Sequence, residues 1–181
     1  LGPGQAVLVP TMTFAATAEV VRYFNARPIL VDCRTEDFNL DVADAERKIQ
    51  SAQAGGLEVA AIIPVHYGGQ IGDVAGVRAL AQRYQLKVVE DAAHCCPAFY
   101  REVGRVTPCA PVAEPLPIAA GSGVPALPAL NSQLSTDWKP VGTGADISCY
   151  SFYANKTITT GEGGMACTNN DEYADRMRIM S

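Results

Sequence analysis

Short apolar runs alternate with amphipathic stretches along most of this chain, and this alternation restricts the possible folds more than any other feature. Between the runs, apolar residues recur at helical spacing over residues 14–25, after Asp41 and over 74–84. The order strand, helix, strand predicts an α/β fold, with a mostly parallel sheet flanked by helices. The four runs with the length and composition of β-strands are residues 6–9, 28–33, 59–65 and 86–90.

Three residues mark where these elements begin. Thr13 precedes the first helical stretch and Asp41 precedes the second, and both are residue types that cap helix N-termini. Pro28 opens the second apolar run, which is tolerated at the start of a strand or on a sheet edge. We therefore expect two capped helices and a strand that lacks one backbone donor near its start.

Asp91 directly follows the apolar run at 86–90. In open parallel sheets, ligands bind outside the carboxyl ends of the strands. The position of Asp91 therefore predicts a binding site there. The alternative is that its carboxylate only caps the turn that follows, as aspartate commonly does.

A turn rich in threonine and glycine lies between two β-prone runs, at 147–152 and 165–168, and carries one lysine. If Lys156 is held between two buried strands, desolvation penalises its ammonium form, which favours a use for the free amine. A nucleophilic lysine forms Schiff bases with carbonyl groups. The alternative is a solvated lysine in a surface loop.

The segment at 151–164, Ser-Phe-Tyr-Ala-Asn-Lys-Thr-Ile-Thr-Thr-Gly-Glu-Gly-Gly, resembles the lysine segment of the DegT/DnrJ/EryC1/StrS family. These are pyridoxal-phosphate-dependent aminotransferases that act on keto sugars attached to nucleotides. Two further segments resemble the family in the same order, Val-Val-Glu-Asp-Ala-Ala-His at 88–94 and Pro-Thr-Met-Thr-Phe-Ala-Ala-Thr at 10–17. The resemblance implies that residues 1–181 form part of the large domain of a fold-type-I aminotransferase. It also implies that an upstream segment and a C-terminal small domain are absent, so the fragment alone is expected to be inactive.

The resemblance implies that pyridoxal 5'-phosphate is the cofactor and assigns roles to five residues. Lys156 holds the cofactor as a Schiff base and moves protons, and Asp91 pairs with the pyridine nitrogen. His94 lies beside the ring hydroxyl, Ser151 binds the phosphate, and Phe14 stacks on the ring. Simpler structural roles stay open for three of them: a buried, backbone-bonded His94, a Ser151 bonded to its own backbone, and a Phe14 packed in the core.

The implied reaction transfers an amino group, from L-glutamate, to a keto group of a nucleotide-linked sugar, in a homodimer of the full-length protein. One alternative is a sugar dehydratase that uses the pyridoxamine form of the cofactor, although those relatives replace the lysine found here at Lys156. Another alternative is an inactive fragment or interaction module that retains the fold.

The composition gives no sign of other partners. A net charge of -5 gives no reason to expect nucleic acid or an anionic membrane as a partner. No apolar run approaches the roughly 20 residues that span a bilayer, and no signal peptide is visible. The six cysteines include no C-x-x-C pair, which favours reduced thiols and a cytoplasmic location. The consecutive residues His94, Cys95 and Cys96 would make a poor tetrahedral zinc site, so no metal is expected.

Residues 106–140 interrupt the alternation and contain seven of the 12 prolines. Proline at this density opposes both helix interiors and sheet ladders. The stretch is therefore predicted to be a disordered or extended insertion in a surface loop of the large domain.

Overall fold

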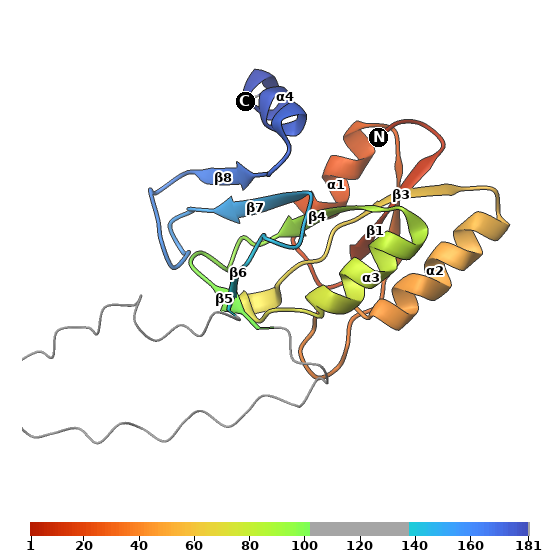
Figure 1. The fold of residues 1–181 in the computed structure, drawn as a ribbon, viewed down its shortest axis with the longest axis horizontal. Coiled ribbons are helices and arrows are strands. Elements are labelled where there is room, and N and C mark those ends of the chain that lie inside the picture. Colours follow the sequence, from red (N-terminus) through yellow and green to blue (C-terminus); the bar gives the residue numbers. More distant parts are fainter. Residues whose placement is uncertain (102–137, 181) are drawn as a thin grey trace, which may run out of the picture.

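The computed structural model describes residues 1–101 and 138–180 and shows a six-stranded sheet in the order β2-β1-β3-β4-β7-β8 (Figure 1). The strands β2, β1, β3, β4 and β7 pair in parallel, and β8 is antiparallel to β7. The predicted α/β fold with a mostly parallel sheet is confirmed. The strand bounds are β1 (Gln5–Pro10), β2 (Arg27–Val31), β3 (Glu58–Ile62), β4 (Lys87–Asp91), β7 (Ile147–Ser151) and β8 (Gly164–Cys167).

Helices cover both faces of the sheet. Successive residues of a strand point to opposite faces, so Leu8 of β1 packs in one core cluster and Val7 in another. Helices α2 and α3 contribute to the cluster around Leu8, whereas α1 contributes Val21 to the cluster around Val7. Within the described ranges, no helix is long and apolar enough to cross a membrane. The helices are α1 (Ala16–Tyr23), α2 (Val42–Ala54), α3 (Val74–Tyr84) and α4 (Asp171–Met180), with a short 3-10 helix η1 (Tyr67–Gly69).

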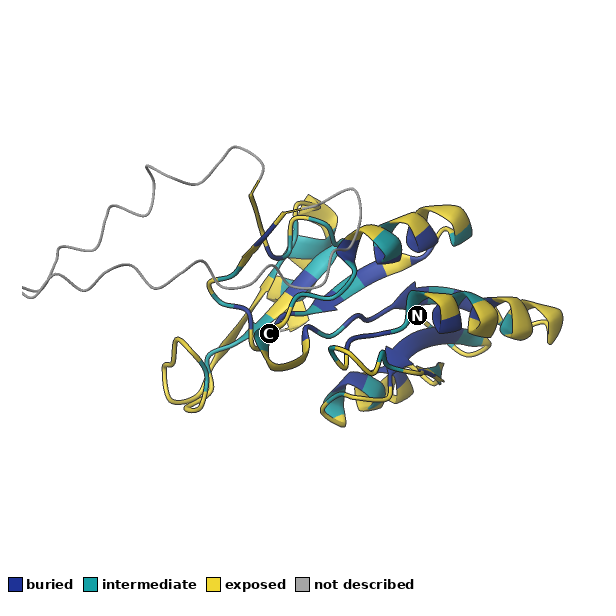
Figure 2. Cartoon of the chain, turned by 90° about the horizontal axis from the view of Figure 1, so that it is seen from below, coloured by how far each residue is buried: buried dark blue, intermediate teal, exposed yellow. Residues whose placement is uncertain are grey.

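Burial is most complete on β1, an inner strand between β2 and β3, and buried residues are dark blue in Figure 2. Ala6, Val7, Leu8 and Val9 of β1 are all 0% exposed. Burial of each larger aliphatic side chain stabilises the fold by about 1.5–3 kcal/mol. The segments that leave the carboxyl ends of the inner strands therefore start from well-packed positions.

One of the two predicted helix caps is present and the other is wrong. Asp41 caps α2, because its Oδ1 accepts from the backbone N–H of Ala43 at 2.8 Å and of Asp44 at 3.3 Å. Thr13 does not cap a helix, since α1 starts at Ala16 and its N-cap residue, Ala15, makes no side-chain cap bond. The Thr13 hydroxyl donates to Thr17 instead. Pro28 lies in β2, an edge strand of the sheet, as expected.

Two short strands join the chain on either side of the undescribed residues. β5 (Phe99–Tyr100) pairs antiparallel with β6 (Lys139–Pro140). The expectation that residues 106–140 form no sheet pairing is therefore wrong at the last two residues. The ladder does not need the N–H that proline lacks, because Val141 N–H donates to the Ala98 carbonyl at 3.0 Å. The predicted disorder of residues 106–137 lies outside the described residues.

The lysine segment is not flanked by two buried strands, contrary to the expectation. Ser148 of β7 is buried, but β8 is mostly exposed and α4 has no buried residue. β8 is exposed because it is an edge strand of the sheet and lies, with α4, on the far side of β7 from β1 and β3 (Figure 1).

Candidate active site

A cleft of about 840 Å³ opens where four of the parallel strands end. Its walls come from the segments that follow β1 and β3 and from the carboxyl ends of β4 and β7. This is the edge at which parallel sheets bind ligands. All five residues assigned to the site from the sequence line this one cleft: Phe14, Asp91, His94, Ser151 and Lys156.

Lys156 lies in the turn between β7 and β8, and its half-buried side chain lines the cleft. All four lysines of the chain lie in the described ranges. Lys48 and Lys139 are exposed, and the Lys87 Nζ pairs with the Asp146 Oδ1 at 3.0 Å. Lys156 is therefore the lysine whose amine the fold brings to the cleft.

Backbone hydrogen bonds close the turn that carries this lysine. The Lys156 N–H donates to the Tyr153 carbonyl at 2.9 Å, and the Phe152 N–H donates to the Gly163 carbonyl at 2.8 Å. Gly163 has a φ of 152°, and a Cβ there would lie 2.5 Å from the Thr160 Oγ1. The turn therefore requires glycine at this position.

Asp91 is held on both carboxylate oxygens. Its Oδ1 accepts from the backbone N–H of Ala93 at 3.2 Å, and its Oδ2 accepts from the Thr17 hydroxyl at 3.2 Å. Its backbone is fixed as well, because the Asp91 N–H donates to the Pro64 carbonyl at 2.9 Å and its carbonyl accepts from the His66 N–H at 3.1 Å. Capping of the turn after β4 accounts for the hydrogen bond at Oδ1. It does not account for the hydrogen bond that Oδ2 accepts from Thr17.

The structure excludes the simpler roles considered for two of the other residues. His94 is exposed, so it is not a buried histidine. Phe14 is 80% exposed and lies before the first residue of α1, so it is not packed in the core. Both side chains line the cleft.

Ser151 makes the local contact that its simpler role predicts, because its Oγ accepts from the backbone N–H of Tyr153 at 3.3 Å. An accepting hydroxyl keeps its own proton, so Ser151 retains a donor for an anion. Ser151 lies at the last position of β7 and lines the cleft.

The cleft also contains residues that the sequence interpretation missed. Thr17 lies in a segment that resembles the family, but its contact with Asp91 spans 74 residues of sequence and no local pattern shows it. Tyr153 and Asn155 belong to the lysine segment itself, and their closeness to Lys156 was a usable signal. Tyr67 lies in the turn after β3, and the composition of that turn does not indicate that its side chain lines a cleft.

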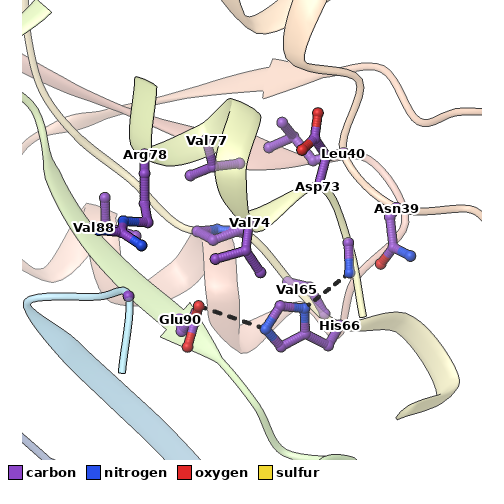
Figure 3. A pocket seen from close by; sticks show the side chains of 13 residues that line it. Asn39, Leu40, Val65, His66, Asp73, Val74, Val77, Arg78, Val88 and Glu90 are labelled. Carbon is purple, nitrogen blue, oxygen red and sulfur yellow. Dashed lines mark hydrogen bonds and ion pairs between the residues drawn. The ribbon is translucent and has the colours of Figure 1, made fainter. Parts of the chain in front are cut away.

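A second, much smaller cavity of about 10 Å³, shown in Figure 3, adjoins the cleft, because Val65 and His66 line both. There the His66 Nδ1 accepts from the Gly72 N–H at 3.2 Å, and the His66 Nε2 lies 3.7 Å from the Glu90 Oε1. Both side chains are buried, at 2% and 3% exposed. This cavity holds at most about one water molecule. The buried His66 therefore has no room for a ligand on this side and is best described as a structural residue.

Two groups that directly adjoin cleft residues in the sequence, the Cys95 thiol and the Tyr150 hydroxyl, have raised pKa values and stay protonated at neutral pH. Burial, followed by the charges of Glu90 and Asp91, raises the pKa of Cys95 to about 11. Burial also raises the pKa of Tyr150 to about 12. The Tyr150 hydroxyl donates to the Val141 carbonyl at 2.6 Å. Neither group is therefore a candidate nucleophile at neutral pH.

The donor set of the cleft fits pyridoxal 5'-phosphate. The cofactor has an aldehyde, a protonated ring nitrogen and a phosphate, which need an amine, an anion and hydrogen-bond donors. Lys156 supplies the amine, Asp91 the carboxylate and Ser151 a hydroxyl. The exposed ring of Phe14 offers a flat apolar surface at the same cleft.

Comparison with known proteins identifies the family of this chain. All of residues 1–181 match the DegT/DnrJ/EryC1/StrS aminotransferase family. GDP-perosamine synthase of Caulobacter vibrioides is 36% identical over 180 residues, which cover 99% of this chain and 37% of that protein. The chain therefore spans little more than a third of the length of this relative.

Solved structures agree in fold. A DegT DnrJ EryC1 StrS aminotransferase from Brucella abortus superposes with a TM-score of 0.73 at 31% identity, covering 98% of this chain and 38% of that one. NtdA from Bacillus subtilis, solved with bound cofactor PMP, superposes with a TM-score of 0.64 at 28% identity, covering 96% of this chain and 30% of its own. The chain thus belongs to the DegT/DnrJ/EryC1/StrS aminotransferase family, and its fold is part of the large domain of a fold-type-I aminotransferase.

Proposed function

We propose that the full-length protein uses pyridoxal 5'-phosphate to transfer an amino group, from L-glutamate, to a keto group of a nucleotide-linked sugar. The observation that carries this proposal is that Lys156 and Asp91 line the same cleft at the carboxyl edge of the sheet. The similarity to a protein named GDP-perosamine synthase supports a sugar substrate linked to a nucleotide.

Lys156 has two tasks in this proposal. Its amine binds the cofactor covalently, and once an amino donor has displaced it, the free amine takes a proton from the donor α-carbon. The same amine returns a proton to the sugar in the second half of the reaction. The bound cofactor supplies a carbonyl that captures amines and a ring that accepts electrons.

The other four residues orient the cofactor. Asp91 places a negative charge beside the ring nitrogen and so favours its protonated form. Ser151 donates its hydroxyl proton to the phosphate, and His94 lies beside the ring hydroxyl. Phe14 packs against the ring face, where an offset aromatic contact contributes about 0.5–1.5 kcal/mol.

We also propose a homodimer in the cytoplasm for the full-length protein. The resemblance to the family supports the dimer, as does the apolar rim of the cleft, where Phe14 is 80% and Tyr153 is 47% exposed. Light scattering on the full-length protein tests this assembly. A monomer at the concentrations used for activity would contradict it.

The reaction is tested with the full-length protein, L-glutamate and a panel of GDP- and UDP-linked keto sugars. We expect the amino sugar and 2-oxoglutarate in equal amounts, both measured by mass spectrometry. Loss of water from the sugar without transfer of nitrogen would identify a dehydratase. Absence of both turnover and cofactor absorbance would identify an inactive relative.

A further inference from the structure

Two threonine hydroxyls form a hydrogen-bonded chain that reaches Asp91 from the start of α1, and no role given above uses it. The Thr13 Oγ1 donates to the Thr17 Oγ1 at 2.7 Å, and the Thr17 Oγ1 donates to the Asp91 Oδ2 at 3.2 Å. Thr17 is 7% exposed and is one of the few buried polar residues of the described chain. The contact therefore lies at the inner wall of the cleft.

The direction of these hydrogen bonds is fixed by chemistry. An ionised carboxylate only accepts hydrogen bonds, so the single proton of the Thr17 hydroxyl points to Asp91. The Thr17 oxygen then has lone pairs left to accept the proton of Thr13. The Thr13 hydroxyl therefore orients the Thr17 hydroxyl so that its proton points to the Asp91 carboxylate.

Thr17 departs from what threonine usually does in a helix. A threonine hydroxyl in a helix commonly bonds a backbone carbonyl one turn earlier, and its χ1 angle is stiff because the side chain is branched at Cβ. Here the donor is directed across the fold to a residue 74 positions away. The stiff side chain thus makes a fixed anchor rather than a local helix contact.

We propose that Thr17 is a positioning residue for Asp91, with Thr13 orienting its hydroxyl. Thr17 holds Oδ2 while the Ala93 N–H holds Oδ1, so the carboxylate is fixed against rotation by both oxygens. A carboxylate has about four lone-pair sites, so acceptor capacity remains for a cationic ring nitrogen in the cleft. The inference rests on the proposed function, because that function gives Asp91 its task.

A purely structural role for Thr17 makes a different prediction. If the hydroxyl only satisfies a half-buried carboxylate, its removal lowers stability and leaves cofactor binding unchanged. If it positions the carboxylate, its removal weakens cofactor binding even in protein that stays fully folded. The two readings are separated by measuring cofactor affinity and the Tm of the cofactor-free protein in the same variants.

The experiment uses the full-length protein, titrated with pyridoxal 5'-phosphate and followed by absorbance of the lysine-bound cofactor. The test variants are Thr17→Val, which is nearly isosteric, Thr17→Ser, which keeps the hydroxyl, and Thr13→Val, which removes only the orienting donor. Thr168→Val is the matched control, because it deletes a hydroxyl that donates to the Asp146 carbonyl at 2.6 Å and lies outside the cleft.

We expect Thr17→Val to weaken cofactor binding roughly tenfold, since hydrogen bonds to charged groups have that order of effect. Thr17→Ser should restore affinity to within about threefold, and Thr13→Val should give a smaller loss than Thr17→Val. Normal affinity in both valine variants at positions 13 and 17 would overturn the inference and leave the proposed function intact. Failure of the unaltered protein to bind cofactor would overturn the proposed function, and this inference with it.

Discussion

Replacement of Asp91 by asparagine separates a catalytic role from a capping role, because the two roles predict different magnitudes. The substitution keeps the shape of the side chain and one acceptor oxygen, but it removes the negative charge. In the structure, the two carboxylate oxygens accept hydrogen bonds from the Ala93 N–H and from the Thr17 hydroxyl, each at 3.2 Å. Asparagine can still serve one of these two donors.

The expected loss of stability is small. Asp91 is half-buried, and replacement of one charge-assisted hydrogen bond costs about 1–2 kcal/mol. The expected loss of activity is much larger. Two unit charges about 4 Å apart at an effective dielectric constant of about 20 attract by roughly 4 kcal/mol. If Asp91 faces the cationic ring nitrogen, loss of this attraction in the transition state lowers turnover roughly a thousandfold.

The assay measures kcat and the free energy of unfolding on the same preparation of the full-length protein. Asp41→Asn is the control, because Asp41 caps α2 outside the cleft and asparagine caps helices equally well. We expect this control to match the unaltered protein in both measurements. Near-normal turnover of Asp91→Asn would show that the carboxylate only caps the turn, and a loss of several kcal/mol in stability would show that it is chiefly structural.

Two further predictions concern Phe14 and Cys95. Phe14→Ala should weaken cofactor binding about five- to tenfold, because it removes the stacked ring, and should change stability by less than about 0.5 kcal/mol, because the ring is 80% exposed. The control is Tyr23→Ala, at a side chain on α1 that is 74% exposed and lies outside the cleft. Equal cofactor affinities for the two variants would contradict the stacking role. Cys95 should resist alkylation at pH 8, because a raised pKa of about 11 keeps the thiol protonated below that pH, and its thiolate fraction grows only as the pH approaches 11. Peptide mass mapping after pulsed alkylation checks this, and labelling of Cys95 as fast as that of Cys33 would refute it.

The main layers of the fold could be predicted because the signals for them are local. The apolar run at 59–65 and the helical spacing of Val74, Val77 and Leu80 each report burial of their own segment. The location of the site at the carboxyl ends of the strands was predictable as well, since neighbouring parallel strands end on the same side of a sheet. Asp91 and Ser151, at the ends of β4 and β7, line the same cleft for this reason. The chemical role of each of the five residues stays a prediction.

The features that could not be predicted depend on contacts between distant segments. Thr13 has the composition of a helix cap, but the position of Thr17 and the start of α1 at Ala16 direct its hydroxyl elsewhere. The burial of the strands around Lys156 was overestimated because composition does not show that β8 lies on a sheet edge. The pairing of Phe99 with Pro140 joins residues on either side of the undescribed segment, and no local pattern indicates it.

The most direct test of the central claim is the identity of the lysine that binds the cofactor. The full-length protein is incubated with pyridoxal 5'-phosphate, reduced with borohydride, digested and mapped by mass spectrometry, with Lys156→Ala and Lys48→Ala treated in parallel. We expect one modified peptide, carrying the cofactor on Lys156, in the unaltered protein and in Lys48→Ala, and no modification in Lys156→Ala. A cofactor adduct on Lys48, Lys87 or Lys139, or an adduct that survives in Lys156→Ala, would contradict the account.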